Sequence, residues 1–69
     1  MNSMGLILKK LRGNIPREAV ANAVGISISA LGMYEQGRRI PRDEVKVRLS
    51  KFYGVPVEKI FYQKYTLKV

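Results

Sequence analysis

The chain has 69 residues, enough for one domain with a small core and too few for a second. Thirteen lysines and arginines against five acidic residues give a formal net charge of +8, which favours a polyanionic partner, nucleic acid first and an anionic membrane surface second. The sequence contains neither cysteine nor histidine, so disulfides, thiol chemistry and the usual zinc sites are excluded.

The composition also argues against catalysis and secretion. The carboxylates are spread along the chain without a paired arrangement, the serines have no histidine to activate them, and no glycine-rich phosphate loop is present. We therefore expect no enzyme, no cofactor and no metal. No apolar run approaches the length of a membrane span, and residues 1–10 lack the basic region and cleavage site of a signal peptide, so we expect a cytoplasmic protein without membrane contact.

Apolar residues recur at helical spacing over residues 4–12 and predict a first helix, which Ser3 can cap and which Gly13 and Asn14 end. The residues expected to face the core are Met4, Ile7, Leu8 and Leu11. The charged residues expected outside are Lys9, Lys10 and Arg12. One of these could pair with Glu35 and brace the first helix against the third, and we favour Lys10 or Arg12 for that pairing.

The stretch from Arg17 to Gln36 predicts two short helices joined by a tight turn. Pro16 fits the first turn of the earlier helix, and Arg17 adds its charge to backbone N–H groups that already favour anions. We therefore expect Arg17 to hold a phosphate rather than only to pair with a nearby carboxylate. The inner face carries Val20, Ala21 and Val24, and Gly25 supplies the permissive backbone of the turn.

The helix after the turn is expected to begin near Ser27, a good N-cap, with Ile26 as an apolar plug in the turn. Its inner face carries Ala30, Leu31 and Tyr34. Its outer face exposes four uncharged residues, Ile28, Ser29, Gly32 and Met33. Because a solvated helix face usually carries lysine and glutamate, an uncharged face framed by arginines indicates a surface that a partner covers. An ordinary helical hairpin has the same apolar spacing, so the spacing alone does not decide.

The run GRRIPRDE over residues 37–44 predicts a basic loop and the start of a fourth helix. Gly37 closes the preceding helix, and Ile40 is expected to be a core anchor. The loop carries Arg38, Arg39 and Arg42 with no acid among them. A charge run is usually a solvated loop, but three arginines beside a candidate reading helix favour contact with phosphates or the minor groove.

The fourth helix is expected from about Arg42 to Tyr53, and the fifth over residues 56–62 after a stop at Gly54. The core residues expected from the two helices are Val45, Leu49, Phe52, Val57, Ile60 and Phe61. The residues expected largely outside are Lys46, Arg48 and Lys51. Val47 and Tyr53 lie off the apolar stripe and would cover a neighbouring helix or form a dimer patch. Residues 63–69 alternate like a strand, which would dock on the body, pair with another chain or fray.

The chain resembles the Cro/Xre-type helix-turn-helix domain, the lambda-repressor-like fold of phage repressors and mobile-element regulators. The resemblance covers about Met4 to Tyr62 and is carried by the segments EAVANAVGIS, YEQGRRIP and FYGVPVEKIF. It implies an all-α, compact bundle of about five helices in a single domain, with a core over about residues 4–62. It also implies sequence-specific binding of double-stranded DNA, usually as a homodimer on a two-fold operator, and a role in transcriptional control.

The resemblance also assigns roles to residues. Arg17 stands where such domains have a polar residue that holds a phosphate, and Glu35 matches a glutamate that pairs with a basic residue of the first helix. The positions that face the major groove are Ser27, Ile28, Ser29 and Met33. The loop positions that track backbone phosphates, and sometimes the minor groove, are Arg38, Arg39 and Arg42.

Two departures from the family pattern matter. Pro16 replaces a hydroxyl residue that often caps the second helix, so that cap must come from elsewhere, and Asn14 is a candidate. The outer face of the third helix lacks arginine, lysine, asparagine and glutamine, the side chains that make bidentate contacts with bases. We therefore expect modest specificity for each half-site, with phosphate contacts and DNA shape supplying much of the affinity.

Two other functions are compatible with the residues. A protein-interaction module, such as an antitoxin or adaptor, would use the uncharged face to dock a protein partner. Binding of RNA or a membrane surface through charge alone is less well supported, because most aromatic residues fall on core or tail positions and no strongly one-sided basic helix is present.

Overall fold

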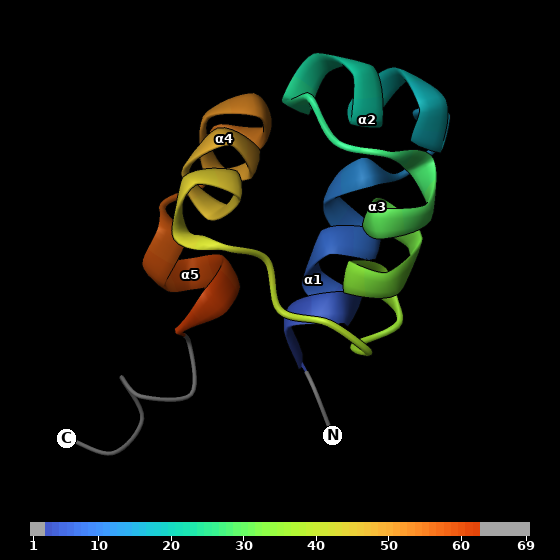
Figure 1. The fold of residues 1–69 in the computed structure, drawn as a ribbon. Coiled ribbons are helices and arrows are strands. Elements are labelled where there is room, and N and C mark those ends of the chain that lie inside the picture. Colours follow the sequence, from blue (N-terminus) through green and yellow to red (C-terminus); the bar gives the residue numbers. More distant parts are fainter. Residues whose placement is uncertain (1–2, 63–69) are drawn as a thin grey trace, which may run out of the picture.

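The computed structural model describes residues 3–62, and within them it contains five helices and no strand (Figure 1). The helices are α1 (Ser3–Arg12), α2 (Arg17–Val24), α3 (Ile28–Glu35), α4 (Asp43–Tyr53) and α5 (Val57–Phe61). All five lie within a residue or two of the ranges expected from the sequence, so the all-α, five-helix architecture is confirmed. The strand expected over residues 63–69 lies outside the described residues.

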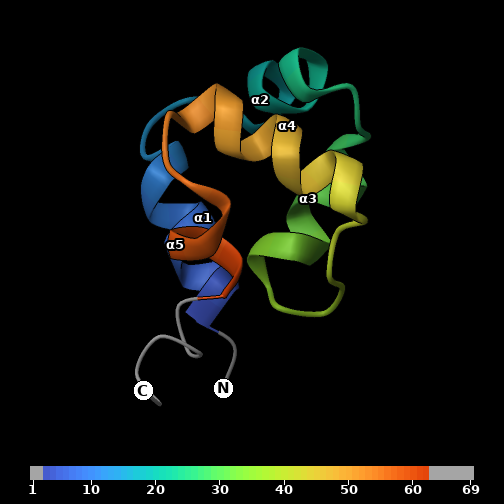
Figure 2. The ribbon, with the colours of Figure 1, turned by 90° about the vertical axis from the view of Figure 1, so that its left-hand side faces the viewer.

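Every helix contributes to one hydrophobic core. Helix α3 packs against α1 and α2, α4 packs against α2 and α5, and α5 also contacts α1, as Figure 2 shows. The most deeply buried residues are Met4, Leu8, Val20, Val24, Leu31, Tyr34, Leu49 and Ile60. Helical spacing in the sequence predicted all of them, because each lies on the apolar stripe of its own helix.

Helices α2 and α3 are joined by the turn that the sequence predicted at Gly25. This residue has a φ of 81°, in the left-handed region that favours glycine, and its N–H donates to the Ala21 carbonyl at 2.8 Å. Ile26 follows, half-buried against the core. Ala21 is only 2% exposed, which confirms that a small residue lies at the inner side of the helix pair.

A close approach between α1 and the end of α3 was not predicted. Gly5 lies on α1, and a Cβ atom added there would come within 2.5 Å of the Glu35 carbonyl oxygen and 3.1 Å of the Gly37 backbone nitrogen. Real Cβ atoms do not approach backbone so closely, so only glycine allows α1 to lie this near to α3. Gly5 therefore sets the distance between the first and third helices.

Two core predictions were wrong. Ile40 is 69% exposed, and the buried residue of the loop is its neighbour Pro41. Helical periodicity cannot fix the side-chain direction in a loop, so a shift of one residue exchanges the inside and the outside. On α4 the core row continues to Tyr53, which is half-buried, whereas Phe52 is 39% exposed and packs its ring against Tyr53 with centroids 5.1 Å apart.

Lys46 was expected outside and is instead only 9% exposed. Its Nζ donates to the Tyr62 hydroxyl at 2.8 Å and lies 4.7 Å from the centroid of the same ring. The ring of Phe61 lies on another side, with its centroid 5.6 Å from Nζ. Aromatic side chains at the end of α5 therefore cover the ammonium of a residue on α4, a long-range contact that α4's own sequence does not reveal.

Candidate functional site

The start of α3 is fixed by Ser27. Its Oγ accepts a hydrogen bond from the Ala30 backbone N–H at 3.0 Å, which confirms the predicted N-cap. The hydroxyl hydrogen is not used by this bond, so Ser27 can still donate to an acceptor outside the chain. The residue is exposed at the end of α3 that follows the turn.

The outer face of α3 is largely as predicted, with one correction. Ile28 is 49% exposed, Ser29 is exposed and Met33 is half-buried. Gly32 was expected on the exposed face but is buried. A glycine has no side chain that could reach past the surrounding turns, so only its backbone could be exposed, and a mid-helix backbone is covered. Three of the four uncharged residues therefore remain accessible on this face.

A buried carboxylate on α3 ties the first three helices together. Glu35 has a side chain with no exposed surface, and it accepts hydrogen bonds from Arg12 Nε at 2.7 Å and from Arg12 Nη2 at 3.2 Å. Arg12 Nη1 also donates to the Ile15 carbonyl at 3.0 Å. The hydrogen bond with Glu35 raises the pKa of Arg12. Of the two residues favoured for this pairing, Arg12 is confirmed, and Lys10 is exposed.

Arg17 reaches the same carboxylate. Its Nε donates to Glu35 Oε1 at 3.2 Å. Of the two roles considered for Arg17, pairing with a carboxylate is therefore present in the structure. The side chain remains 40% exposed, and its other N–H groups make no hydrogen bond within residues 3–62. Pro16 stands at the N-cap of α2 without a side-chain cap, and the Asn14 cap suggested by the sequence does not form. The first N–H groups of α2 therefore have no side-chain partner beside Arg17.

Tyr53 of α4 interacts electrostatically with Glu35 and Arg12. The Tyr53 hydroxyl is buried and has no hydrogen-bond partner within the described part of the chain. Burial raises the pKa of Tyr53, and the charge of Glu35 raises it further, while the charge of Arg12 lowers it. The hydrogen bonds to Glu35 therefore come from α1 and α2, and they fix how α3 lies against these two helices.

The three arginines of the loop between α3 and α4 are exposed. The side chains of Arg38, Arg39 and Arg42 make no ion pair or hydrogen bond to any other part of residues 3–62. The nearest acid in sequence, Asp43, has a side chain that is 96% exposed and lies 3.8 Å from Lys46. The loop charges are therefore uncompensated and are available to an anion.

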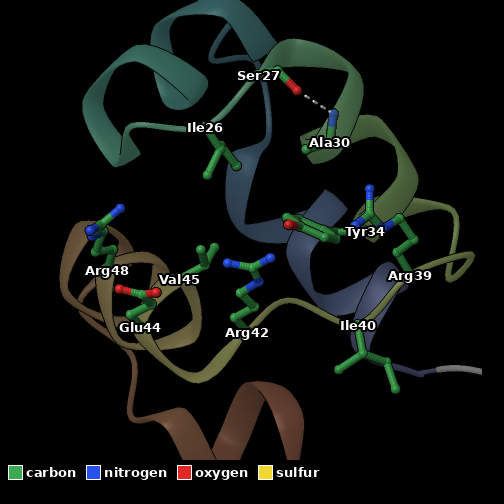
Figure 3. A pocket seen from close by; sticks show the side chains of 10 residues that line it. All are labelled: Ile26, Ser27, Ala30, Tyr34, Arg39, Ile40, Arg42, Glu44, Val45 and Arg48. Atoms are coloured by element: carbon green, nitrogen blue, oxygen red, sulfur yellow. Dashed lines mark hydrogen bonds between the residues drawn. The ribbon is translucent and has the colours of Figure 1, made fainter.

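The fold gathers part of this loop around a hollow of about 360 Å³ between α3 and α4 (Figure 3). Arg39 and Arg42 line it together with Ser27, whereas Arg38 and Arg17 do not. Arg48 and Glu44 of α4 also line it. Arg48 is exposed, as predicted, but its place beside the turn could not be predicted because it depends on how α4 packs against α2. The remaining lining side chains are Ile26, Ala30, Tyr34, Ile40 and Val45.

Within residues 3–62, no group of three or more acidic, histidine or cysteine side chains is placed to hold a metal ion. Over the same part of the chain, no helix combines the length and apolar character needed to cross a membrane.

The comparison with known protein families agrees with this geometry. A family model described as helix-turn-helix matches residues 8–60, which include α2, the turn at Gly25 and α3. The chain belongs to the Cro/C1-type helix-turn-helix family. This finding confirms the resemblance that the sequence segments indicated.

This helix-turn-helix chain is 33% identical over 51 residues to the cryptic phage CTXphi transcriptional repressor RstR of Vibrio cholerae. The match covers 74% of the chain and 46% of the relative, so the chain spans about half the length of that relative. No solved structure matches it. A protein-interaction module is not favoured by these findings.

Proposed function

We propose that this protein is a sequence-specific double-stranded-DNA-binding transcriptional regulator, a repressor of the phage type, that acts without catalysis in the cytoplasm. Family membership and the repressor named among its relatives support the proposal. The observation that carries it is the arrangement of a Ser27-capped α3, uncharged on its outer face, beside arginines that have no ion-pair partner among residues 3–62. In this proposal α3 enters the major groove and the loop after it grips the backbone.

The chemistry of α3 defines how bases are read. Ser27 and Ser29 offer hydroxyl groups to base edges, and Ile28 and Met33 offer apolar contact to thymine methyl groups. None of these side chains makes a bidentate contact with a base, so discrimination at each position is modest. Backbone contacts and sequence-dependent DNA shape then contribute much of the specificity and affinity.

The backbone contacts come from two places. Arg17 and the uncapped N–H groups of α2 hold one phosphate, and the exposed loop arginines, Arg38, Arg39 and Arg42, hold others on the far side of α3. Contact with about four phosphates per subunit gives a slope of log K against log salt of roughly −4 per subunit. A homodimer on a two-fold operator would place two such subunits one helical turn of DNA apart, about 34 Å.

The decisive experiment is selection of bound sequences from a random duplex pool. We expect an enriched inverted repeat with half-sites about one turn apart, because a two-fold dimer imposes its symmetry on the DNA. Enrichment of an unpaired half-site would contradict the dimer, and absence of any enrichment would contradict sequence-specific binding.

Variants then locate the surface. Replacing Arg38 and Arg39 with alanine should weaken binding to all duplexes alike, whereas Ser29→Ala should change the sequence preference. The matched control is Lys51→Ala with Lys59→Ala, which removes the same charge from exposed positions on α4 and α5. Equal loss of affinity in the two double variants would show that net charge alone, and not this surface, binds the DNA.

A further inference from the structure

Arg48 is the one arginine of α4, and its side chain reaches the helix-turn-helix unit. Its Nη1 lies 3.5 Å from the Val24 carbonyl at the end of α2, and 3.6 Å from the position of a Cβ added to Gly25. The hydrogen bond is at the long limit for such contacts and is correspondingly weak. The residue is exposed, and its Nε and Nη2 groups make no hydrogen bond within residues 3–62. Most of its donors are therefore available to a ligand.

The hollow that Arg48 lines carries an excess of positive charge. Arg39 and Arg42 line it as well, and Glu44 is the acid among the lining residues. No ion pair between Glu44 and any of these arginines forms in the described part of the chain. Three apolar side chains, Ile26, Ala30 and Val45, also line the hollow. Arg39, Arg42 and Arg48 are all exposed, so an anion can approach their guanidinium groups from solvent.

The arrangement of these guanidinium groups distinguishes an extended anion from a small one. Figure 3 shows those of Arg48, Arg42 and Arg39 spread from one end of the hollow to the other rather than converging on a point. A single small anion would leave at least one of them unsatisfied. A chain of phosphates separated by sugars would reach all three and would place its sugars against the apolar side chains that line the hollow.

We propose that Arg48 is a DNA-backbone contact and that the hollow seats a segment of one sugar–phosphate strand. Arg48 donates to a phosphate oxygen at the end nearest the turn, while Arg42 and Arg39 hold the phosphates that follow. Its weak bond to the Val24 carbonyl aims the guanidinium, so the end of α2 positions this contact. The inference rests on the proposed DNA-binding function and adds a residue of α4 to it.

The test compares Arg48→Ala with Lys51→Ala, which removes the same charge from an exposed position on α4 that does not line the hollow. Duplex affinity is measured for the full chain over a series of salt concentrations, well below the unfolding temperature of each variant. We expect Arg48→Ala to lower affinity about ten-fold and to reduce the salt slope by about 1, and Lys51→Ala to change neither appreciably. Arg48→Lys, which keeps the charge, should retain the slope and lose affinity only in part.

Three outcomes would overturn the inference. One is that Arg48→Ala matches Lys51→Ala in both quantities. Another is that Arg48→Ala lowers affinity but leaves the salt slope unchanged, because the slope counts phosphate contacts and a residue that only stabilises the turn would not alter it. The third is saturable, Arg48-dependent binding of inorganic phosphate that does not compete with duplex DNA, which would assign the hollow to a free anion. If the unaltered protein binds no duplex at all, the proposed function fails as well, so the two failures are distinguishable.

Discussion

The close approach of α1 to α3 makes a strong prediction for Gly5→Ala. In an open helix, replacing glycine with alanine stabilises the folded state by about 1 kcal/mol. At Gly5 the new methyl group would lie 2.5 Å from the Glu35 carbonyl oxygen and 3.0 Å from its carbon, which are backbone atoms that cannot turn aside. Forcing such a group into a packed contact costs typically about 1–3 kcal/mol, and more when a helix must move.

The cost at Gly5 extends beyond the contact itself. Moving α3 away from α1 would stretch the hydrogen bonds from Arg12 to Glu35, now 2.7 and 3.2 Å long. We therefore expect a net loss of about 1–3 kcal/mol in the free energy of unfolding, after the helix-propensity gain is subtracted. For a domain of this size the melting temperature would fall by roughly 4–8 °C for each kcal/mol.

Gly32→Ala is the matched control, because it makes the same change inside another helix. Apart from its chain neighbours and the backbone of its own helix, nothing lies within 4 Å of a Cβ added at Gly32. Its helix propensity should therefore raise the free energy of unfolding by about 0.5–1 kcal/mol. Chemical and thermal unfolding of both variants, followed by circular dichroism, measures the difference. A Gly5→Ala variant as stable as the unaltered protein would refute the reasoning, as would equal effects at the two positions.

Three further predictions follow from the buried contacts. Arg12→Ala should lower the free energy of unfolding by about 2–4 kcal/mol, because it removes the main partner of a buried carboxylate. Arg17 pairs with the same carboxylate but is more exposed, so Arg17→Ala should cost less than about 1 kcal/mol. Equal losses for the two variants in urea titrations would contradict this prediction. Ile40 is exposed and Leu49 is buried, so Ile40→Ala should change the free energy of unfolding by less than about 0.5 kcal/mol and Leu49→Ala should lower it by about 2–5 kcal/mol. A large loss for Ile40→Ala would show that the Ile40 side chain lies in the core. Burial raises the pKa of Tyr53, so the folded state holds the phenol proton more tightly than the unfolded chain does. The stability gained from this proton is complete below a pH of about 10 and is lost as the pH rises further. Tyr53→Phe should therefore remove part of the alkaline decline in melting temperature, and an unchanged decline would contradict this assignment.

Much of the fold was predictable because the signals are local. Gly25 at the turn, Ser27 at the start of α3 and Gly54 at the end of α4 act through their own backbone or the next turn of helix, and the structure confirms all three. The core residues were predictable because helical spacing places them on one face. The pairing of Arg12 with Glu35 is long-range, and the sequence indicated it only as one of two choices, Lys10 or Arg12.

The residues that sequence reasoning missed act across the bundle. The role of Gly5 depends on how closely α1 approaches the end of α3, and the place of Arg48 depends on α4 lying beside the turn. Lys46 is buried by aromatic rings from α5. Ile40 shows a different limit, since periodicity has no meaning in the loop that contains it.

The composition gives only the net charge, whereas the structure shows which arginines are paired with an acid and which are not. Arg12 and, in part, Arg17 are matched by the single buried carboxylate of Glu35, so those charges serve the pose of α3 more than they serve a polyanion. Arg38, Arg39 and Arg42 have no such partner in the described residues. Attraction for DNA should therefore be strong beside α3, where three exposed arginines follow one another in a single loop. A field concentrated next to the reading helix orients the protein on the duplex before any base is contacted, which suits a face that itself offers few strong base contacts.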